Sequence, residues 1–119
     1  MKIIIKRPGE CPEVKDIRDD EDGAITDLQE IVGGYVQLVH VFSPYDGLVL
    51  IVDEDGKCKE GYRENIVLPD STGKVVDFCV GTVAVAGLVR NKERELVLGS
   101  VAKSKYEWVK NWLDVRSIG

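Results

Sequence analysis

Short runs of apolar, mostly β-branched residues recur along the chain and predict β-strands. The first run covers residues 2–6 and is stopped by a Pro8-Gly9 pair, which predicts a turn. Two later runs, at 35–42 and 48–52, are apolar almost without interruption. Because strands with one exposed face alternate apolar and polar residues, we expect these two to be central strands covered on both faces.

Three weaker patterns complete the predicted sheet. Residues 13–18 alternate apolar and polar positions and predict a short edge strand. Residues 74–86 predict a strand that bends at Gly81, and residues 93–98 are expected to pair with it. The link at 43–47 contains Pro and Gly, which predicts a hairpin connection.

The first predicted helix has about ten residues. We expect Asp22 to be its N-cap, since a carboxylate accepts the free backbone N–H groups of a first turn. Gly33 and Gly34 are expected to end it, because glycine adopts the left-handed conformation that closes a helix. The apolar stripe of this helix consists of Ala24, Ile25, Leu28, Ile31 and Val32.

The second predicted helix lies near the C-terminus. Two starts fit the sequence: Ser100 as a cap, or a capping box formed by Ser104 and Glu107. Its apolar stripe consists of Ala102, Tyr106, Val109 and Leu113, with Trp108 and Trp112 beside it.

These elements predict an α+β domain that spans residues 1–119. We expect a mostly antiparallel sheet of about five to six strands with two helices, one after the first strands and one C-terminal, because links of hairpin length dominate. Residues 57–73 carry few apolar side chains and are expected to form a long irregular loop, while 53–56 predicts a tight hairpin turn.

Composition narrows the classes of function. The net charge of −5 disfavours nucleic-acid binding, which relies on Lys and Arg clusters. No apolar run approaches the roughly 20 residues that cross a bilayer, and the first strand is too short for a leader. Three cysteines without CxxC spacing indicate reduced thiols and a cytoplasmic protein. We expect no metal and no cofactor.

The residues that could take part in catalysis do not match a catalytic or metal-binding motif. Asp53-Glu54-Asp55 is interpreted as part of a turn, because a calcium loop needs further spaced acidic residues. His40 lies within an apolar run, which favours a core or edge histidine over a catalytic one. Cys79 lies within a predicted strand, which favours an inert buried thiol. Cys58 lies between two lysines and is the one thiol whose pKa they could lower. We expect that the protein is not an enzyme.

Five residues form the candidate ligand site. Tyr62, Arg63 and Asn65 occur within four positions of the predicted loop, with Arg7 and Thr82 as further contacts. Arginine suits phosphate or carboxylate, tyrosine stacks on rings and asparagine recognises amide or ribose edges. A solvent-exposed connector is the alternative interpretation.

Two further groups of residues could bind a partner protein. Asp19, Asp20 and Glu21 belong to a dense acidic run, which a solvated loop before a helix also explains. Trp108 and Trp112 favour a place in the core, but an exposed ring would anchor a partner.

Four segments resemble the DUF3846 family of small proteins, which are common in phages and conjugative elements. They are MKIIIKRPG at 1–9, LQEIVGGYV at 28–36, DGLVLIVD at 46–53 and VGTVAV at 80–85. The resemblance extends from residue 2 to about residue 85 and fades through the C-terminal helix. Its motifs are structural, so it implies the fold more than the function and transfers no functional residue.

From the resemblance we expect a non-catalytic accessory protein of a phage or mobile element, located in the cytoplasm of the bacterial host. The favoured hypothesis is a homo-oligomeric counter-defence binder that sequesters a small nucleotide-type immune signal between subunits. The first alternative is an inhibitor that binds a host defence protein through an acidic or aromatic surface. An uncharacterised structural domain and an enzyme that uses Cys58 or His40 are the remaining alternatives.

Overall fold

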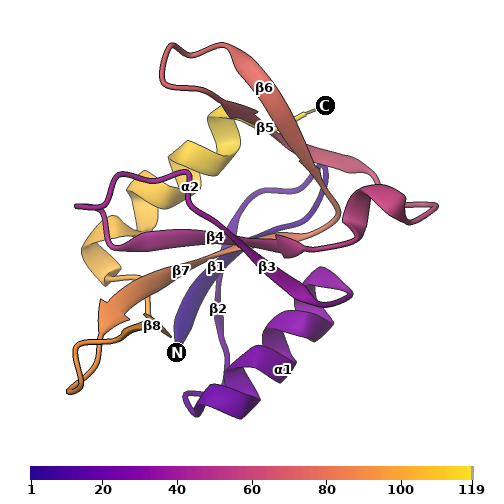
Figure 1. Ribbon diagram of the computed structural model, residues 1–119. Helices are drawn as coiled ribbons and strands as arrows, with labels where there is room; N and C mark the ends of the chain where they lie inside the picture. The colour runs from indigo at the N-terminus through magenta and orange to yellow at the C-terminus, as the bar shows by residue number, and fades with distance from the viewer. Residues whose placement is uncertain (119) are drawn as a thin grey trace.

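A six-stranded antiparallel sheet carries one helix on one face, and a helix with a separate β-hairpin on the other (Figure 1). The computed structural model describes residues 1–118. The strands are β1 (Lys2–Lys6), β2 (Glu13–Asp16), β3 (Val36–Val39), β4 (Leu48–Asp53), β5 (Glu64–Pro69), β6 (Val75–Val80), β7 (Val83–Arg90) and β8 (Leu96–Gly99). The α-helices are α1 (Glu21–Val32) and α2 (Tyr106–Val115), and the short 3₁₀ turns are η1 (Gly56–Cys58) and η2 (Lys103–Lys105). The predicted α+β class is confirmed.

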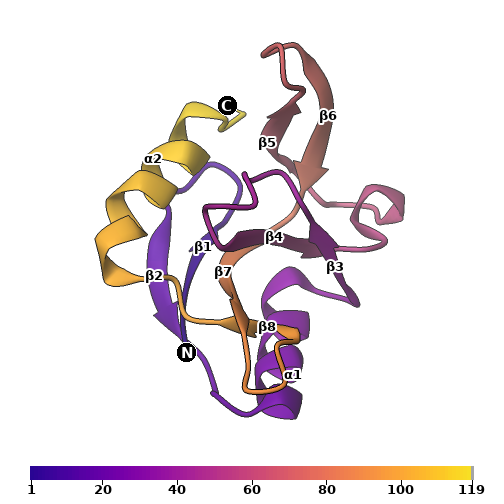
Figure 2. The same ribbon diagram turned by 60° about the vertical axis from the view of Figure 1, so that its left-hand side comes forward.

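Strand β7 is the centre of the main sheet. The strand order is β2-β1-β7-β4-β3, and β8 pairs with the outer part of β7. Strands β5 and β6 form a separate two-stranded sheet that projects from the body (Figure 2). The backbone of Val67 and of Ile118 bonds across the outer edge of β5, so the C-terminal residues hold the hairpin against α2.

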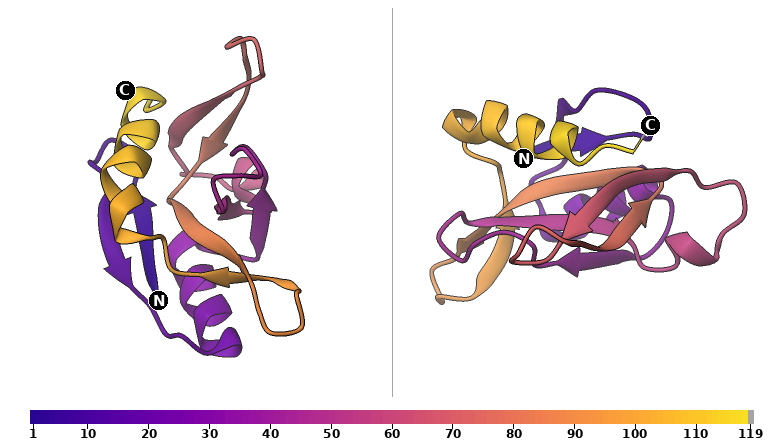
Figure 3. Two further views of the ribbon diagram at one scale, coloured as in Figure 1. Left: turned by 90° about the vertical axis from the view of Figure 1, so that its left-hand side faces the viewer. Right: turned by 90° about the horizontal axis from the view of Figure 1, so that it is seen from above.

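Apolar runs in the central strands supply both faces of the sheet with core residues. In β1, Ile4 points to the face that α2 covers, whereas Ile3 and Ile5 point to α1. The same alternation holds in β4, all six of whose residues are buried. The prediction of a central strand covered on both faces is therefore confirmed for 48–52. The views in Figure 3 show how the two helices lie on opposite sides of these strands.

Helix α1 begins and ends through two specific residues. Asp20, and not Asp22 as predicted, is the N-cap, and its carboxylate accepts the Gly23 N–H at 2.8 Å. Gly33 ends the helix in the left-handed conformation (φ 90°), as predicted, and donates its N–H to the carbonyl of Gln29 at 2.8 Å.

Three predictions about strands were wrong. Strand β3 covers only Val36–Val39 and ends the strand order beside β4, so it is an edge strand and not a central one. The segment 74–86 is two strands in different sheets, β6 and β7, separated by Gly81 at φ 72°. The loop 57–73 contains β5, so the turn after β4 leads into η1 and a second sheet and does not form a hairpin.

The start of α2 differs from both predicted alternatives. The helix begins at Tyr106 after η2, and its N-cap Lys105 makes no side-chain capping bond. Ser104 lies within η2. The Ser100 hydroxyl oxygen instead accepts the backbone N–H of Lys2 at 2.9 Å, which fixes the approach of the chain to β1.

Candidate functional site

Three of the predicted ligand residues line a shallow recess of about 280 Å³, here called the Arg63 recess. It forms where the end of α1, the segment before β5 and the turn between β6 and β7 meet. Its lining consists of Pro8, Ile31, Val32, Gly33, Gly61, Tyr62, Arg63, Gly81 and Thr82. Three of the five predicted ligand residues, Tyr62, Arg63 and Thr82, therefore lie together.

Arg63 is the cationic group of this recess. It is exposed, and no ion pair of residues 1–118 involves it. Its guanidinium lies beside Gly9, where an added methyl group would stand 3.2 Å from Nη2. Its backbone carbonyl accepts the Gly81 N–H at 2.8 Å. The backbone is thus fixed while the guanidinium is available to an anion.

Tyr62 forms a wall of the recess. Its ring packs on Gly81, where an added methyl group would lie 3.0 Å from Cδ2, and its hydroxyl donates to the Gly33 carbonyl at 3.4 Å. A side chain on Gly33 would collide with that hydroxyl. Gly33 and Gly81 therefore hold the ring in place. Because Gly81 covers part of the ring, less of it is available to stack on a ligand.

An ion pair beneath Tyr62 stabilises the loop that leads to the recess. Lys59 Nζ lies 2.7 Å from Oδ2 of the buried Asp53 and donates to the Gly33 carbonyl at 2.8 Å. The hydrogen bond to Asp53 raises the pKa of Lys59. A methyl group on Gly34 would lie 2.6 Å from Lys59 Nζ and 2.7 Å from Asp53 Oδ1, so both ends of the pair would have to move. The pair therefore joins the C-terminal end of α1 to the 57–63 segment.

Asn65 is wholly buried and is not a ligand contact, so this prediction was wrong. Its Nδ2 donates to the carbonyls of Lys6 and Gly81, each at 2.8 Å. Its Oδ1 accepts from Lys6 Nζ at 2.8 Å, and Lys6 also donates to the Arg7 carbonyl at 3.3 Å. Burial lowers the pKa of Lys6, and no carboxylate of residues 1–118 lies within hydrogen-bonding distance of its ammonium group. This network joins β1, β5 and the turn before β7.

Arg7 and Thr82 differ in their relation to the recess. Arg7 Nη1 forms an ion pair with Glu13 Oε1 at 2.6 Å, and this bond raises the pKa of Arg7. Arg7 does not line the recess. Thr82 is half-buried and does line it. Arg63 and Thr82 are thus the polar side chains that the structure leaves for a ligand.

The acidic residues before α1 have separate roles. Asp19 pairs with the Met1 amine, and Asp20 caps α1, so both carboxylates have partners within the chain. Glu21 is exposed in the first turn of α1. Asp19 and Glu21 also line a larger cavity, which is described below.

The two tryptophans do not share one environment. Trp112 is half-buried, with its ring centroid 4.6 Å from that of Phe42 and the Arg116 guanidinium 4.1 Å from its own centroid. Trp108 is 48% exposed, so the prediction of a core position was wrong for this ring. It lies 6.1 Å from Phe42 at the edge of the same cluster.

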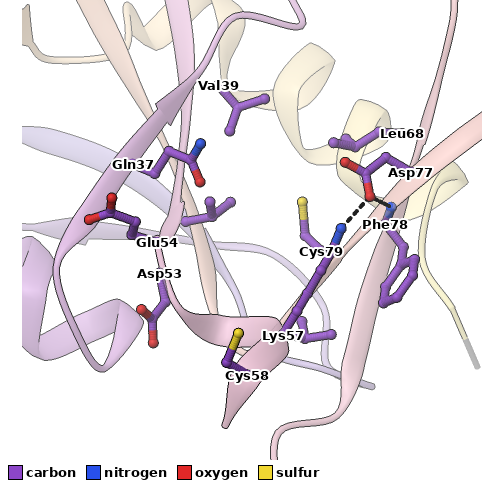
Figure 4. Close-up of a pocket in the computed structure, with 12 residues that line it drawn as sticks. Gln37, Val39, Asp53, Glu54, Lys57, Cys58, Leu68, Asp77, Phe78 and Cys79 are labelled. Carbon is purple, nitrogen blue, oxygen red and sulfur yellow. Dashed lines mark hydrogen bonds and ion pairs between the residues drawn. The ribbon is translucent and has the colours of Figure 1, made fainter.

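A second cavity of about 210 Å³ lies between β3, β4, η1 and β6 (Figure 4). Val39, Val52 and Leu68 contribute apolar lining, and the Lys57–Asp77 ion pair lies at its border. That pair lowers the pKa of Asp77. Like the Arg63 recess, this cavity is smaller than the roughly 300–1,000 Å³ of a typical site for a small molecule.

The candidate reactive groups are spread over different environments. Cys79 is buried as predicted, and burial raises the pKa of its thiol to about 11. Cys58 is exposed, and the lysines beside it pair with Asp77 and Asp53. His40 follows the edge strand β3 and is exposed, so of the two predicted places, core and edge, the structure agrees with the edge. Within residues 1–118, no cluster of three or more Cys, His, Asp or Glu side chains could hold a metal ion.

The largest of the three cavities described here was not predicted from the sequence. A groove of about 420 Å³, here called the α1–β8 groove, lies between the first half of α1, the edge strand β3 and the β7–β8 hairpin. Its lining consists of Met1, Asp19, Glu21, Ala24, Ile25, Val36, Leu38, Asn91, Leu96, Val97 and Leu98. The alternating apolar positions Val36 and Leu38, and Leu96 and Leu98, were the available signal.

Comparison with known proteins places the chain in a family. Nothing matches it among curated proteins or solved structures. No helix in the part of the chain described by the structure is both long and apolar enough to cross a membrane. The family model described as "Domain of unknown function (DUF3846)" matches residues 1–107, and the chain therefore belongs to the DUF3846 family.

Proposed function

We propose that this protein is a non-catalytic cytoplasmic binding protein of a phage or mobile element, and that it acts in counter-defence by sequestering a small nucleotide-type immune signal. The observation that carries the proposal is the Arg63 guanidinium, which lies in a concave recess without an ion-pair partner among the described residues. A planar guanidinium binds phosphate oxygens through two parallel hydrogen bonds, and the Thr82 hydroxyl lies in the same recess.

The ligand is held between two copies of the chain. Sites for small molecules usually enclose about 300–1,000 Å³. The recess of one copy measures about 280 Å³ and is shallow. A second copy would enclose the ligand and supply a second arginine to the phosphates. This arrangement requires a homo-oligomer.

A non-catalytic role agrees with the positions of the reactive groups. Cys79 is buried with a pKa of about 11, which keeps its thiol protonated at neutral pH. Cys58 and His40 are exposed outside the Arg63 recess. The recess offers hydrogen-bond donors that can hold a phosphate, and its lining contains no carboxylate, histidine or cysteine to act on one.

A thermal-shift assay with cyclic nucleotides and ADP-ribose derivatives tests the proposal. At a ligand concentration of 100 times Kd, binding adds about 2.7 kcal/mol to the free energy of unfolding, so a retained ligand raises Tm measurably. We expect Arg63→Ala to abolish the shift. Arg7→Ala is the matched control, because Arg7 lies nearby but pairs with Glu13. Native mass spectrometry of the purified protein reports subunit number and any co-purified ligand. No shift and no retained ligand across this panel would refute the proposal.

The second candidate function is an inhibitor that binds a host defence protein directly. It is favoured by the α1–β8 groove, where exposed leucines lie beside the acidic residues Asp19 and Glu21. The remaining interpretation, a structural accessory domain, has no specific observation in its favour.

A further inference from the structure

The α1–β8 groove is an apolar surface whose walls come from three separate elements. Ile25 of α1, Leu38 of β3 and Leu96 of β8 line it, and Leu38 and Leu96 are 40% and 54% exposed. Large apolar side chains that converge on one concavity mark interaction sites more reliably than scattered ones do. Its volume of about 420 Å³ also exceeds that of the other two cavities described here.

The groove exists because one helix is too narrow to cover this face of the sheet. Strands β7 and β4 lie side by side here, with β3 beside the C-terminal part of β4 and β8 beside the C-terminal part of β7. A helix with its side chains is about 10 Å across. Helix α1 covers the buried positions Ala84, Ala86 and Ile51 and leaves the half-buried Leu88 and Leu98 at the margin of this core. One helix therefore leaves apolar side chains of β3 and β8 uncovered on either side of it.

We propose that the α1–β8 groove binds an amphipathic helix of a partner protein, with apolar residues on the face that docks and basic residues beside it. The acidic residues on the rim of the groove are the reason for expecting a basic partner. Met1, Asp19 and Glu21 all line the groove, and the Met1 amine pairs with Asp19, whereas Glu21 has no ion-pair partner among residues 1–118 and leaves the rim with a net negative charge. The chain as a whole has a net charge of −5, which further favours a cationic partner.

The same charges disfavour a second copy of this chain as the occupant. If two grooves met across a two-fold axis, each would bring its unpaired Glu21 to the same interface, and like charges destabilise such a contact. The helices of this chain cannot dock in the groove of a second copy without leaving their own core. Helix α1 buries Leu28 and Val32 there, and α2 buries Val109 and Leu113.

This inference deepens the second candidate function and does not depend on the Arg63 recess. It predicts the helix-in-groove mode, in which side chains at i, i+3, i+4 and i+7 anchor the partner. The exposed leucines are the expected anchoring contacts, and the rim carboxylates are expected to set the preference for charge and the dependence on salt.

The test uses a labelled model peptide of about 18 residues with leucines on one helical face and lysines elsewhere, and a second peptide with glutamates in place of the lysines. Fluorescence anisotropy measures their binding to the full chain. We expect the lysine peptide to bind and the glutamate peptide to bind at least about tenfold more weakly. Raising the salt from roughly 50 mM to roughly 300 mM should weaken the lysine peptide several-fold.

Three variants locate the site. Leu38→Asp and Leu96→Asp should each weaken the lysine peptide about tenfold or more, and Glu21→Lys should weaken it several-fold and reduce the salt effect. Val76→Asp is the matched control, because Val76 is 61% exposed on β6, away from the groove. Thermal unfolding checks that each variant is folded, which the exposure of all three sites predicts.

Several outcomes would overturn the inference. Equal binding of the two peptides would show that the groove does not prefer a basic partner. Equal binding of the lysine peptide to wild type and to the leucine variants would show that the groove is not the binding site. A concentration-dependent dimer that Leu96→Asp disrupts would make a second copy the occupant. Arg63→Ala should leave peptide binding unchanged, so failure of nucleotide sequestration and failure of this inference are distinguishable.

Discussion

The two faces of the central sheet are built from the same strands but are covered to different extents. On one face, α2 and the β5–β6 hairpin together enclose a core that includes Leu50, Ile66 and Leu113 (Figure 2). On the other face, α1 alone covers the sheet, and the α1–β8 groove remains beside it. The first face therefore contributes mainly stability, and the second retains surface for binding.

The residues of β7 show how the sequence encodes this difference. On the α2 face it carries Val83 and Val85, which fill the space beneath a helix and a hairpin. On the α1 face it carries Ala84 and Ala86, whose small side chains let a single helix approach closely. Comparable perturbations on the two faces should therefore have unequal effects.

The largest expected effect is at Asn65, which anchors the hairpin on the doubly covered face. Asn65→Ala leaves the buried Lys6 ammonium group without its side-chain acceptor and two carbonyls without donors. We expect a loss of about 3–5 kcal/mol in the free energy of unfolding, measured by urea denaturation. Asn111→Ala, at an exposed position of α2, is the control and should change it by less than about 0.5 kcal/mol.

The Lys6 charge can be separated from the lost hydrogen bonds. In a Lys6→Met background there is no buried ammonium group, so Asn65→Ala should cost less than it does in the wild type. Equal costs in both backgrounds would show that Lys6 and Asn65 are not energetically coupled.

Truncating one leucine on each face compares the faces directly. Leu113 of α2 is fully buried, and Leu113→Ala should cost about 2–5 kcal/mol because it leaves a cavity. Leu96, at the groove, is 54% exposed, and Leu96→Ala should change stability by less than about 1 kcal/mol. Similar losses for both variants would mean that the groove is part of a closed core.

Gly33 tests how the end of α1 is held on the singly covered face. Gly33→Ala forces a side chain into a backbone at φ 90° and against the Tyr62 hydroxyl, with an expected loss of about 2–3 kcal/mol. Gly73→Ala is matched in conformation (φ 86°), but an added methyl group has no neighbour within 4 Å, so it should cost about 1–2 kcal/mol. If thermal or urea unfolding shows equal losses, Tyr62 does not pack against the helix end as described.

The smallest expected effect is the pH dependence of the ion pair between α1 and the segment after β2. Arg18 Nη2 lies 2.9 Å from Asp27 Oδ1, and this bond lowers the pKa of Asp27 from its usual 3.8. The folded state therefore favours the carboxylate. The contribution of the Asp27 carboxylate to the free energy of unfolding is complete above pH 3.8. It is lost as the pH falls through the lowered pKa of Asp27 in the folded state.

We therefore expect Asp27→Asn to have a lower Tm than the wild type at pH 7, with the two values converging in strong acid. Glu93→Gln, at an exposed position that forms no ion pair among residues 1–118, is the control and should show no such convergence. A Tm difference that is independent of pH would assign the effect of Asp27→Asn to something other than this pair.

Much of the fold could be predicted from local patterns. Strands β1 and β4 were recognised because an unbroken apolar run is the sequence mark of burial on both faces. The end of α1 was recognised because Gly33 is followed by a second glycine. Strand β5 was missed because its apolar run is only three residues long, 66–68, and lies between Asn65 and Pro69.

The candidate site was predictable only in part, because residue type does not show where a polar group finds its partner. Asn65 and Arg63 are both polar and only two positions apart, yet one is wholly buried in an internal network and the other is exposed. The α1–β8 groove depends on how much of a face one helix covers, and that is a property of the tertiary arrangement.

Methyl NMR of the full chain during titration with the lysine-rich amphipathic peptide compares the two faces most directly. The central claim is that only the α1 face retains surface for a partner helix. It predicts shifts at the methyl groups of Ile25, Leu38 and Leu96, with Leu68 and Leu113 unchanged. Shifts centred on Leu68 and Leu113, or spread equally over both faces, would contradict it.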